Sequence, residues 1–173
     1  MIPLLKMKQG VERILNVPGN YRGGILEMAV VVDCSLEKEC ASESIKAVLK
    51  ALKSHSDTFR NVRLNVIWWK SDSEIETEVI PMTVMQMGTP FDSYEQKTES
   101  KHLDGLLSHL KMFQARSKLI LLLGRGDFAI GQEEVCLENL KPFLGRKMLF
   151  LLEEISEPLE KLSLKARMIL QKV

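Results

Sequence analysis

The segment from Ile25 to Val32 constrains the fold more than any other part of the chain. Its residues read ILEMAVVV, a nearly continuous apolar run that ends at Asp33. A strand that is apolar on both faces is typical of a parallel sheet covered by helices on both sides. We therefore expect residues 26–32 to form a central strand of an α/β domain.

Helical and β patterns alternate along the rest of this domain. Apolar residues at helical spacing predict helices over residues 40–54, 103–113, 132–144 and 159–169. β-Rich runs predict strands over residues 61–70, 75–87, 119–123 and 148–152. This alternation predicts a doubly wound, mostly parallel sheet with helices on both faces, a three-layer Rossmann-like sandwich.

One strand is expected to run against the others. Pro81 lies inside the run 75–87, and proline is confined to edge positions because it cannot donate to the ladder. The short turn at residues 71–73 joins this run to the preceding strand, which indicates an antiparallel hairpin. The sheet should therefore carry one antiparallel strand at an edge.

The main domain is predicted to span residues 25–173, with an N-terminal arm before it over residues 1–24. Helix breakers at residues 16–20 end a short apolar stripe at helical spacing, made by Leu4, Met7, Val11, Ile14 and Leu15. Such a stripe should pack on the domain or pair two copies of the chain in a homo-oligomer.

Composition excludes several classes of protein. In 173 residues, 45% are hydrophobic and 27% charged, which suits a folded domain with a substantial core. A net charge of +1 argues against a nucleic-acid binder, and no apolar run is long enough for membrane insertion. Three cysteines and no recognisable signal peptide indicate an intracellular chain, cytoplasmic or nuclear, without a disulfide framework.

Doubly wound sheets bind ligands beyond the carboxyl ends of their strands, where the strand order reverses. Here that region comprises the loops after Val32 and Leu123. The first loop reads Asp33-Cys34-Ser35-Leu36-Glu37. It resembles the start of the metal-ion-dependent adhesion site of von Willebrand factor A domains, which is Asp-x-Ser-x-Ser. The order of strands and helices from residue 25 to 172 agrees with that resemblance.

The resemblance also suggests where the family motif is incomplete. Asp33 and Ser35 stand at the first two ligand positions, whereas Glu37 replaces the second serine. The threonine ligand of the family corresponds to Thr98 or Ser100, just before the predicted helix 103–113.

The family's last site residue is an aspartate after the fourth strand, where this chain has Arg125, with Asp127 two residues further on. An arginine supplies no lone pair and repels a dication. We therefore expect a degenerate site without metal or cofactor, in which Arg125 pairs with Asp33 or Glu37.

The function implied by this resemblance is non-catalytic. We expect a protein–protein interaction module, a component of a larger complex, that binds a protein partner through this top face. The alternative from the sequence is a small α/β nucleotide- or phosphate-binding protein or enzyme. It would use the glycine loop Gly124-Arg125-Gly126, which follows a buried strand and precedes a helix.

Overall fold

The computed structural model describes residues 26–53, 62–143 and 147–172. The described strands form one six-stranded sheet of order β3-β2-β1-β4-β5-β6. The elements are β1 (Leu26–Asp33), α2 (Lys38–Lys53), β2 (Val62–Trp69), β3 (Ile75–Val79), α3 (Met82–Met87), the 3-10 helix η1 (Thr89–Phe91), α4 (Leu103–Phe113), β4 (Leu119–Gly124), α5 (Glu133–Leu140), the 3-10 helix η2 (Lys141–Phe143), β5 (Lys147–Leu152), α6 (Glu157–Ala166) and β6 (Ile169–Lys172).

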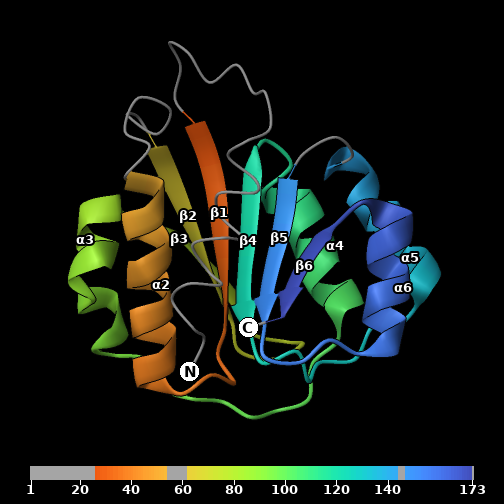
Figure 1. Cartoon of the computed structure of the whole chain (residues 1–173), viewed down its shortest axis with the longest axis horizontal. Coiled ribbons are helices and arrows are strands. Elements are labelled where there is room, and N and C mark those ends of the chain that lie inside the picture. The colour runs from red at the N-terminus through yellow and green to blue at the C-terminus, as the bar shows by residue number, and fades with distance from the viewer. Residues whose placement is uncertain (1–25, 54–61, 144–146, 173) are drawn as a thin grey trace.

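The strand order confirms the predicted topology. β1 is central and pairs in parallel with β2 on one side and β4 on the other, while β3 is an antiparallel edge strand beside β2. After β1 the chain builds outward through β2 and β3, then crosses back to β4 and builds outward through β5 and β6 (Figure 1). The carboxyl ends of β1 and β4 therefore lie side by side at the point where the strand order reverses.

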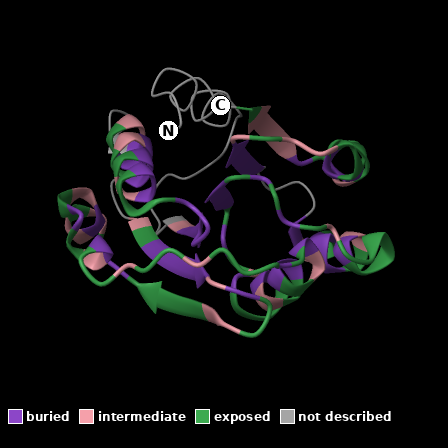
Figure 2. Cartoon of the chain, turned by 90° about the horizontal axis from the view of Figure 1, so that it is seen from below, coloured by how far each residue is buried: buried purple, intermediate pink, exposed green. Residues whose placement is uncertain are grey.

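Helices cover both faces of the sheet, as predicted. α2 and α3 lie over one face, and α4, α5 and α6 pack on the other (Figure 1). β1 contributes to both cores, because Met28, Val30 and Val32 face α2, whereas Ala29 and Val31 face α4. All five of these side chains are fully buried, and Figure 2 shows the strands at the middle of the sheet in the colour of buried residues. The continuous apolar run of β1 is thus explained by burial on both sides.

The segment predicted as one strand over residues 75–87 contains a strand and a helix. β3 ends at Val79, and Pro81 then caps α3 at a φ of −58°, an angle that suits a helix start. Gly88 ends α3 with a φ of +78°, the left-handed conformation that glycine adopts readily. Pro81 therefore marks the start of a new element instead of a position within the edge strand.

The C-terminal prediction also needs correction, because the helix stops before Ile169. Arg167 has a φ of +55° and closes α6, after which β6 adds a sixth strand in parallel beside β5. Ile169 contacts the core beneath α2 and Leu170 contacts the opposite core. Successive side chains point to opposite faces in a strand, as Ile169 and Leu170 do here. The prediction that Ile169 ends a helix is therefore wrong.

The predicted N-terminal arm, residues 1–24, falls outside the described residues, so its packing stays a prediction. All three cysteines, Cys34, Cys40 and Cys136, are described, and each is buried and free. Among the described helices none combines the length and the apolar character that crossing a bilayer requires.

Candidate functional site

Asp33 organises the loop that follows the central strand. Its Oδ1 accepts hydrogen bonds from the Ser35 backbone N–H at 3.0 Å and from Ser35 Oγ at 2.8 Å. This side-chain-to-backbone turn leads the chain from β1 into α2. Asp33 is completely buried and Ser35 is 3% exposed. The structure thus brings together the first two predicted site residues, but beneath the surface.

The cation beside Asp33 is Lys101. Its ammonium lies 2.5 Å from Asp33 Oδ1 and donates to the Trp69 carbonyl at 2.9 Å. The same nitrogen stands 5.1 Å from the centre of the Trp69 ring, within range of a cation–π interaction. Lys101 is only 3% exposed. A buried ammonium is tolerable here because a carboxylate, a carbonyl and an aromatic face all surround it.

The chain segment that delivers Lys101, residues 94–101, forms a strap across the loop 33–36. Each loop residue is contacted by the strap, in reverse order along the chain. The four contacts are Lys101 Nζ to Asp33 Oδ1, Lys97 N to Cys34 O at 2.7 Å, Gln96 Nε2 to Ser35 O at 3.0 Å and Tyr94 OH to Leu36 O at 2.7 Å. Four linked contacts hold the switch-point loop in one conformation.

The strap is itself fixed to its neighbours. Ala129 N donates to the Lys101 carbonyl at 3.0 Å, and Leu103 N donates to the Ala129 carbonyl at 2.7 Å. On the other side, His102 donates its backbone N–H to Asp72 at 2.7 Å, and its ring Nδ1 lies 2.7 Å from the same carboxylate. The hydrogen bond and charge of Asp72 raise the pKa of His102 above its ordinary value. The end of the strap is therefore held by hydrogen bonds to the β2–β3 turn on one side and to the loop after β4 on the other.

Arg125 does not pair with Asp33 or Glu37, so that prediction is wrong. Its side chain is 45% exposed, and its Nε lies 3.8 Å from Asp127 Oδ2. Backbone hydrogen bonds hold the loop after β4 against the end of β5, from Glu154 N to Arg125 O at 2.9 Å and from Glu153 N to Gly124 O at 3.3 Å. This pairing leaves the arginine side chain at the surface, while Lys101 takes the place next to Asp33.

The remaining predicted residues lie at the surface around this buried pair. Glu37, Thr98, Ser100, Arg125 and Asp127 are all exposed. Glu37 and Arg125 line the same cavity, of about 250 Å³, but no ion pair joins them. Three sequence-predicted residues, Glu37, Arg125 and Asp127, thus present charges on the rim of the switch point without touching Asp33.

These side chains do not fit a divalent cation of the kind that the family motif implies. Asp33 Oδ1 is already engaged by Lys101 and Ser35, and a dication bound at Asp33 would adjoin the ammonium. Asp33 Oδ2 is buried without a hydrogen-bond partner, but it lies against Gly124, where an added Cβ would come within 3.0 Å. Among the described residues no three His, Cys, Asp or Glu side chains converge as a metal site.

The glycine loop after β4 is explained by packing. Gly126 has a φ of +86°, and an added Cβ would meet the Glu154 carbonyl oxygen at 1.9 Å. Near the start of α5, where a phosphate would bind, Gln132 N already donates to the Asp104 carboxylate at 3.1 Å. The first turn of α5 also contains Glu133 and Glu134, which disfavour an anion.

Cys34 is poorly suited to act as a nucleophile. Its side chain is 1% exposed, and burial raises the pKa of its thiol to about 11. A thiol with that pKa is almost entirely protonated near neutral pH.

Sequence reasoning missed Lys101 as the cation of this site. The available signal was a lysine two residues before an apolar helix, directly after Ser100, which is one of the two candidates for the family's threonine ligand.

Comparisons with known proteins address the fold. No family model matches the sequence. No curated protein matches it either. A similar solved structure is the crystal structure of an aerotolerance-related membrane protein from Bacteroides fragilis, with multiple mutations to serines. The TM-score is 0.59 at 10% sequence identity, covering 86% of this chain and 91% of that chain. At this identity the likeness concerns the fold alone, and together with the mixed sheet it shows that the chain has a von Willebrand factor A-like α/β fold.

Proposed function

We propose that this chain is a non-catalytic protein-interaction module that works without a divalent cation. The observation that carries the proposal is the contact of the Lys101 ammonium with Asp33 at the carboxyl end of the central strand. In this proposal the lysine is an internal counter-ion that stands where a metal-dependent relative would hold a metal. The von Willebrand factor A-like fold supports an interaction-type domain in general terms.

Electrostatics favours the lysine over a metal at this position. At roughly 4 Å and an effective dielectric of 20, two unit charges repel by about 4 kcal/mol, and a dication and an ammonium by about twice that. Mg²⁺ also gives up its hydration water reluctantly and needs several oxygen ligands. Asp33 offers one buried oxygen that is not already hydrogen-bonded, and Ser100 and Thr98 are exposed.

The surface above the pair is suited to recognition of a protein. Glu37, Arg125 and Asp127 present both signs of charge on a rim braced by the strap, so little ordering is needed when a partner binds. The inert, buried Cys34 agrees with an intracellular location, which is part of the proposal.

The proposal can be tested by capturing the native complex with tagged protein in buffer that contains EDTA. A charge-exchanged variant, Arg125→Asp with Asp127→Arg, keeps the net charge and alters the proposed face. The matched control exchanges Lys141 and Glu138, an exposed ion pair at the C-terminal end of α5 with an N–O distance of 2.7 Å. We expect the same partner with wild type and control, and its loss with the variant. Capture that requires Mg²⁺, or that the face variant leaves intact, would contradict the proposal.

A further inference from the structure

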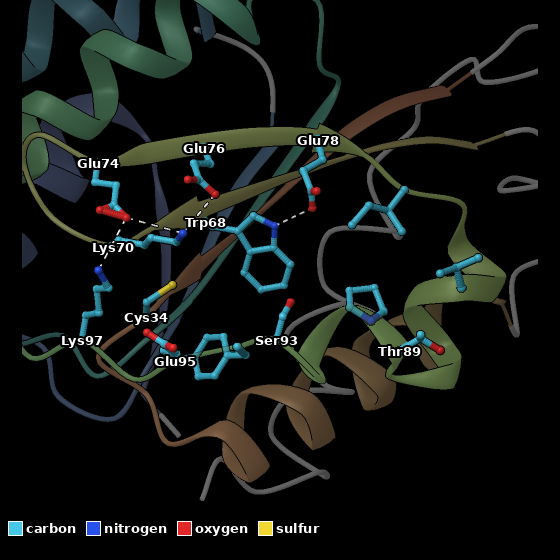
Figure 3. Close-up of a pocket in the computed structure, with 14 residues that line it drawn as sticks. Cys34, Trp68, Lys70, Glu74, Glu76, Glu78, Thr89, Ser93, Glu95 and Lys97 are labelled. Carbon is cyan, nitrogen blue, oxygen red and sulfur yellow. Dashed lines mark hydrogen bonds and ion pairs between the residues drawn. The ribbon is translucent and has the colours of Figure 1, made fainter.

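A groove lies beside the antiparallel edge strand and reaches the switch-point loop at Cys34, on the side away from Arg125. Its volume is about 540 Å³. It is bounded by the β2–β3 hairpin on one side and by η1 and the segment after it on the other. Figure 3 shows Glu76, Glu78 and Trp68 projecting from the hairpin on the side that faces Ser93 and Glu95. The groove is therefore open along the outermost strand of the sheet.

The outer edge of β3 has free backbone groups. Across the hairpin, Lys70 N donates to the Glu74 carbonyl and Ile80 N donates to the Leu64 carbonyl, each at 3.1 Å. Hydrogen-bonded pairs alternate along an antiparallel ladder, so the N–H and C=O groups of Ile75, Thr77 and Val79 point away from β2. In the described part of the chain no further strand pairs with this edge. It is an available template for one more strand.

The charge beside this edge is negative. The groove is lined by four glutamates and two lysines: Glu74, Glu76, Glu78, Glu95, Lys70 and Lys97. Both lysines form ion pairs near the β2–β3 turn. Lys70 Nζ lies 3.0 Å from the Glu76 carboxylate and 3.5 Å from that of Glu74, and Lys97 Nζ lies 3.5 Å from the Glu74 carboxylate. Glu78 and Glu95 have no ion-pair partner among the described residues. The negative charges of Glu78 and Glu95 are thus not balanced by an ion pair within the described residues, and Glu78 lies at the end of the groove away from Lys70 and Lys97 (Figure 3).

An aromatic wall stands next to this negative charge. Trp68 donates its Nε1 hydrogen to Glu78 Oε2 at 2.8 Å, which fixes the carboxylate without neutralising it. Trp68 also packs against Phe91 and Tyr94, with ring centres 5.4 and 6.2 Å away. Trp68 is only 7% exposed, so the half-buried Tyr94 provides most of the aromatic surface of the groove. An aromatic surface near a carboxylate is suited to the stem and cationic head of lysine or arginine.

A second copy of β3 is a poor partner for this edge. Antiparallel self-pairing centred on Thr77 places Glu76 of one copy opposite Glu78 of the other, on the same face. Like charges directly opposite one another destabilise a sheet. Glutamates along an exposed edge therefore discourage self-association and favour a strand that carries positive charge.

We propose that this edge and groove bind an extended segment of a partner protein that carries lysine or arginine at alternate positions. The segment would add a strand to β3, with basic side chains opposite Glu76 and Glu78 and β-branched ones opposite Thr77 and Val79. This inference goes beyond the proposed function, since it involves neither the Asp33–Lys101 pair nor the charges at the switch point. If partner binding at the switch point proved to require a metal, the proposal for the β3 edge would still stand.

The test uses a fluorescent nine-residue peptide in which lysine and valine alternate, and measures its binding by polarisation. The comparison peptide has the same composition with its lysines contiguous. Glu76→Gln with Glu78→Gln removes the charges. Glu134→Gln with Glu160→Gln is the matched control, since these exposed glutamates lie on α5 and α6. Thr77→Pro removes one outward N–H and leaves the inner ladder of Glu76 and Glu78 in place.

We expect the alternating peptide to bind wild type and control equally. The charge variant should bind about tenfold more weakly, the loss expected from two cross-strand charge pairs. Thr77→Pro should abolish binding, and peptide addition should perturb the NMR amide signals of Ile75, Thr77 and Val79 in wild type. The amide signals provide the test if Thr77→Pro fails to fold. Equal binding of both peptides, or unchanged binding by the charge variant, would overturn the proposal. Self-association of wild type through β3, detected by light scattering and abolished by the charge variant or Thr77→Pro, would also overturn it by assigning the edge to a second copy.

Discussion

Replacing Lys101 by methionine removes the ammonium from Asp33 while keeping most of the side-chain volume. Asp33 is completely buried, so the variant leaves an uncompensated buried carboxylate. Breaking a buried pair from one side costs about 3–5 kcal/mol. The Trp69 carbonyl keeps the hydrogen bond from Cys34 N at 3.0 Å, so the loss arises mainly at Asp33. For a chain of this size, with about 2–4 °C per kcal/mol, the melting temperature should fall by roughly 6–20 °C.

The double variant Asp33→Asn with Lys101→Met separates charge from packing. A buried ion pair replaced on both sides is often neutral or stabilising, so the double variant should melt close to wild type. Lys141→Met serves as the control for losing an exposed pair, since Lys141 is 65% and Glu138 is 59% exposed, and should change stability by about 1 kcal/mol or less. The assay is calorimetric or circular-dichroism melting of all four proteins. If Lys101→Met melted like the control, or the double variant were less stable than Lys101→Met, Lys101 would not be the counter-ion that makes the buried Asp33 tolerable.

Three further predictions concern other parts of the face. The pKa of His102, followed by NMR, should lie above the ordinary 6.5 and return toward it in Asp72→Asn. Because the folded-state pKa is raised, this contact stabilises the fold fully below about pH 6.5 and loses its effect as pH rises through the raised value. Cys34, with a pKa of about 11, should resist alkylation near neutral pH until urea unfolds the chain, and reaction of the native protein at the rate of a free thiol would count against this. Gly126→Ala should lower the unfolding free energy by at least about 2 kcal/mol in urea titration, since a Cβ there meets the Glu154 carbonyl at a positive φ; an unchanged midpoint would exclude that packing.

Local pattern was sufficient to predict most of the fold. β1 could be placed at the centre of the sheet because burial on both faces leaves a continuous apolar run, which an exposed strand does not have. β6 was not predicted because its four residues are too few to show a period, and Ile169 extends the helical stripe of α6 by coincidence of spacing. α3 was not predicted because Pro81 was interpreted as part of an edge strand, although proline also begins helices.

The site could be located from the sequence but its contacts could not. Topology alone places the switch point after Val32 and Leu123, because carboxyl ends of parallel strands meet at one edge. The partner of Asp33 depends on how the strap, residues 94–101, crosses that edge. Lys101 follows Asp33 by 68 positions in the sequence, so local spacing does not predict their contact. Arg125 and Lys101 carry the same charge and both lie near the carboxyl ends of the central strands, so composition and spacing do not show which of them pairs with Asp33. The choice is made by backbone hydrogen bonds that hold Arg125 outward.

We infer that an internal lysine, and not a divalent cation, balances Asp33 at the switch point. Titration calorimetry of the wild-type chain with Mn²⁺ tests it most directly, with Asp33→Asn titrated in parallel. We expect no saturable heat at millimolar Mn²⁺ in either protein and no increase in melting temperature when the ion is added. Micromolar binding by wild type that Asp33→Asn abolishes would contradict it.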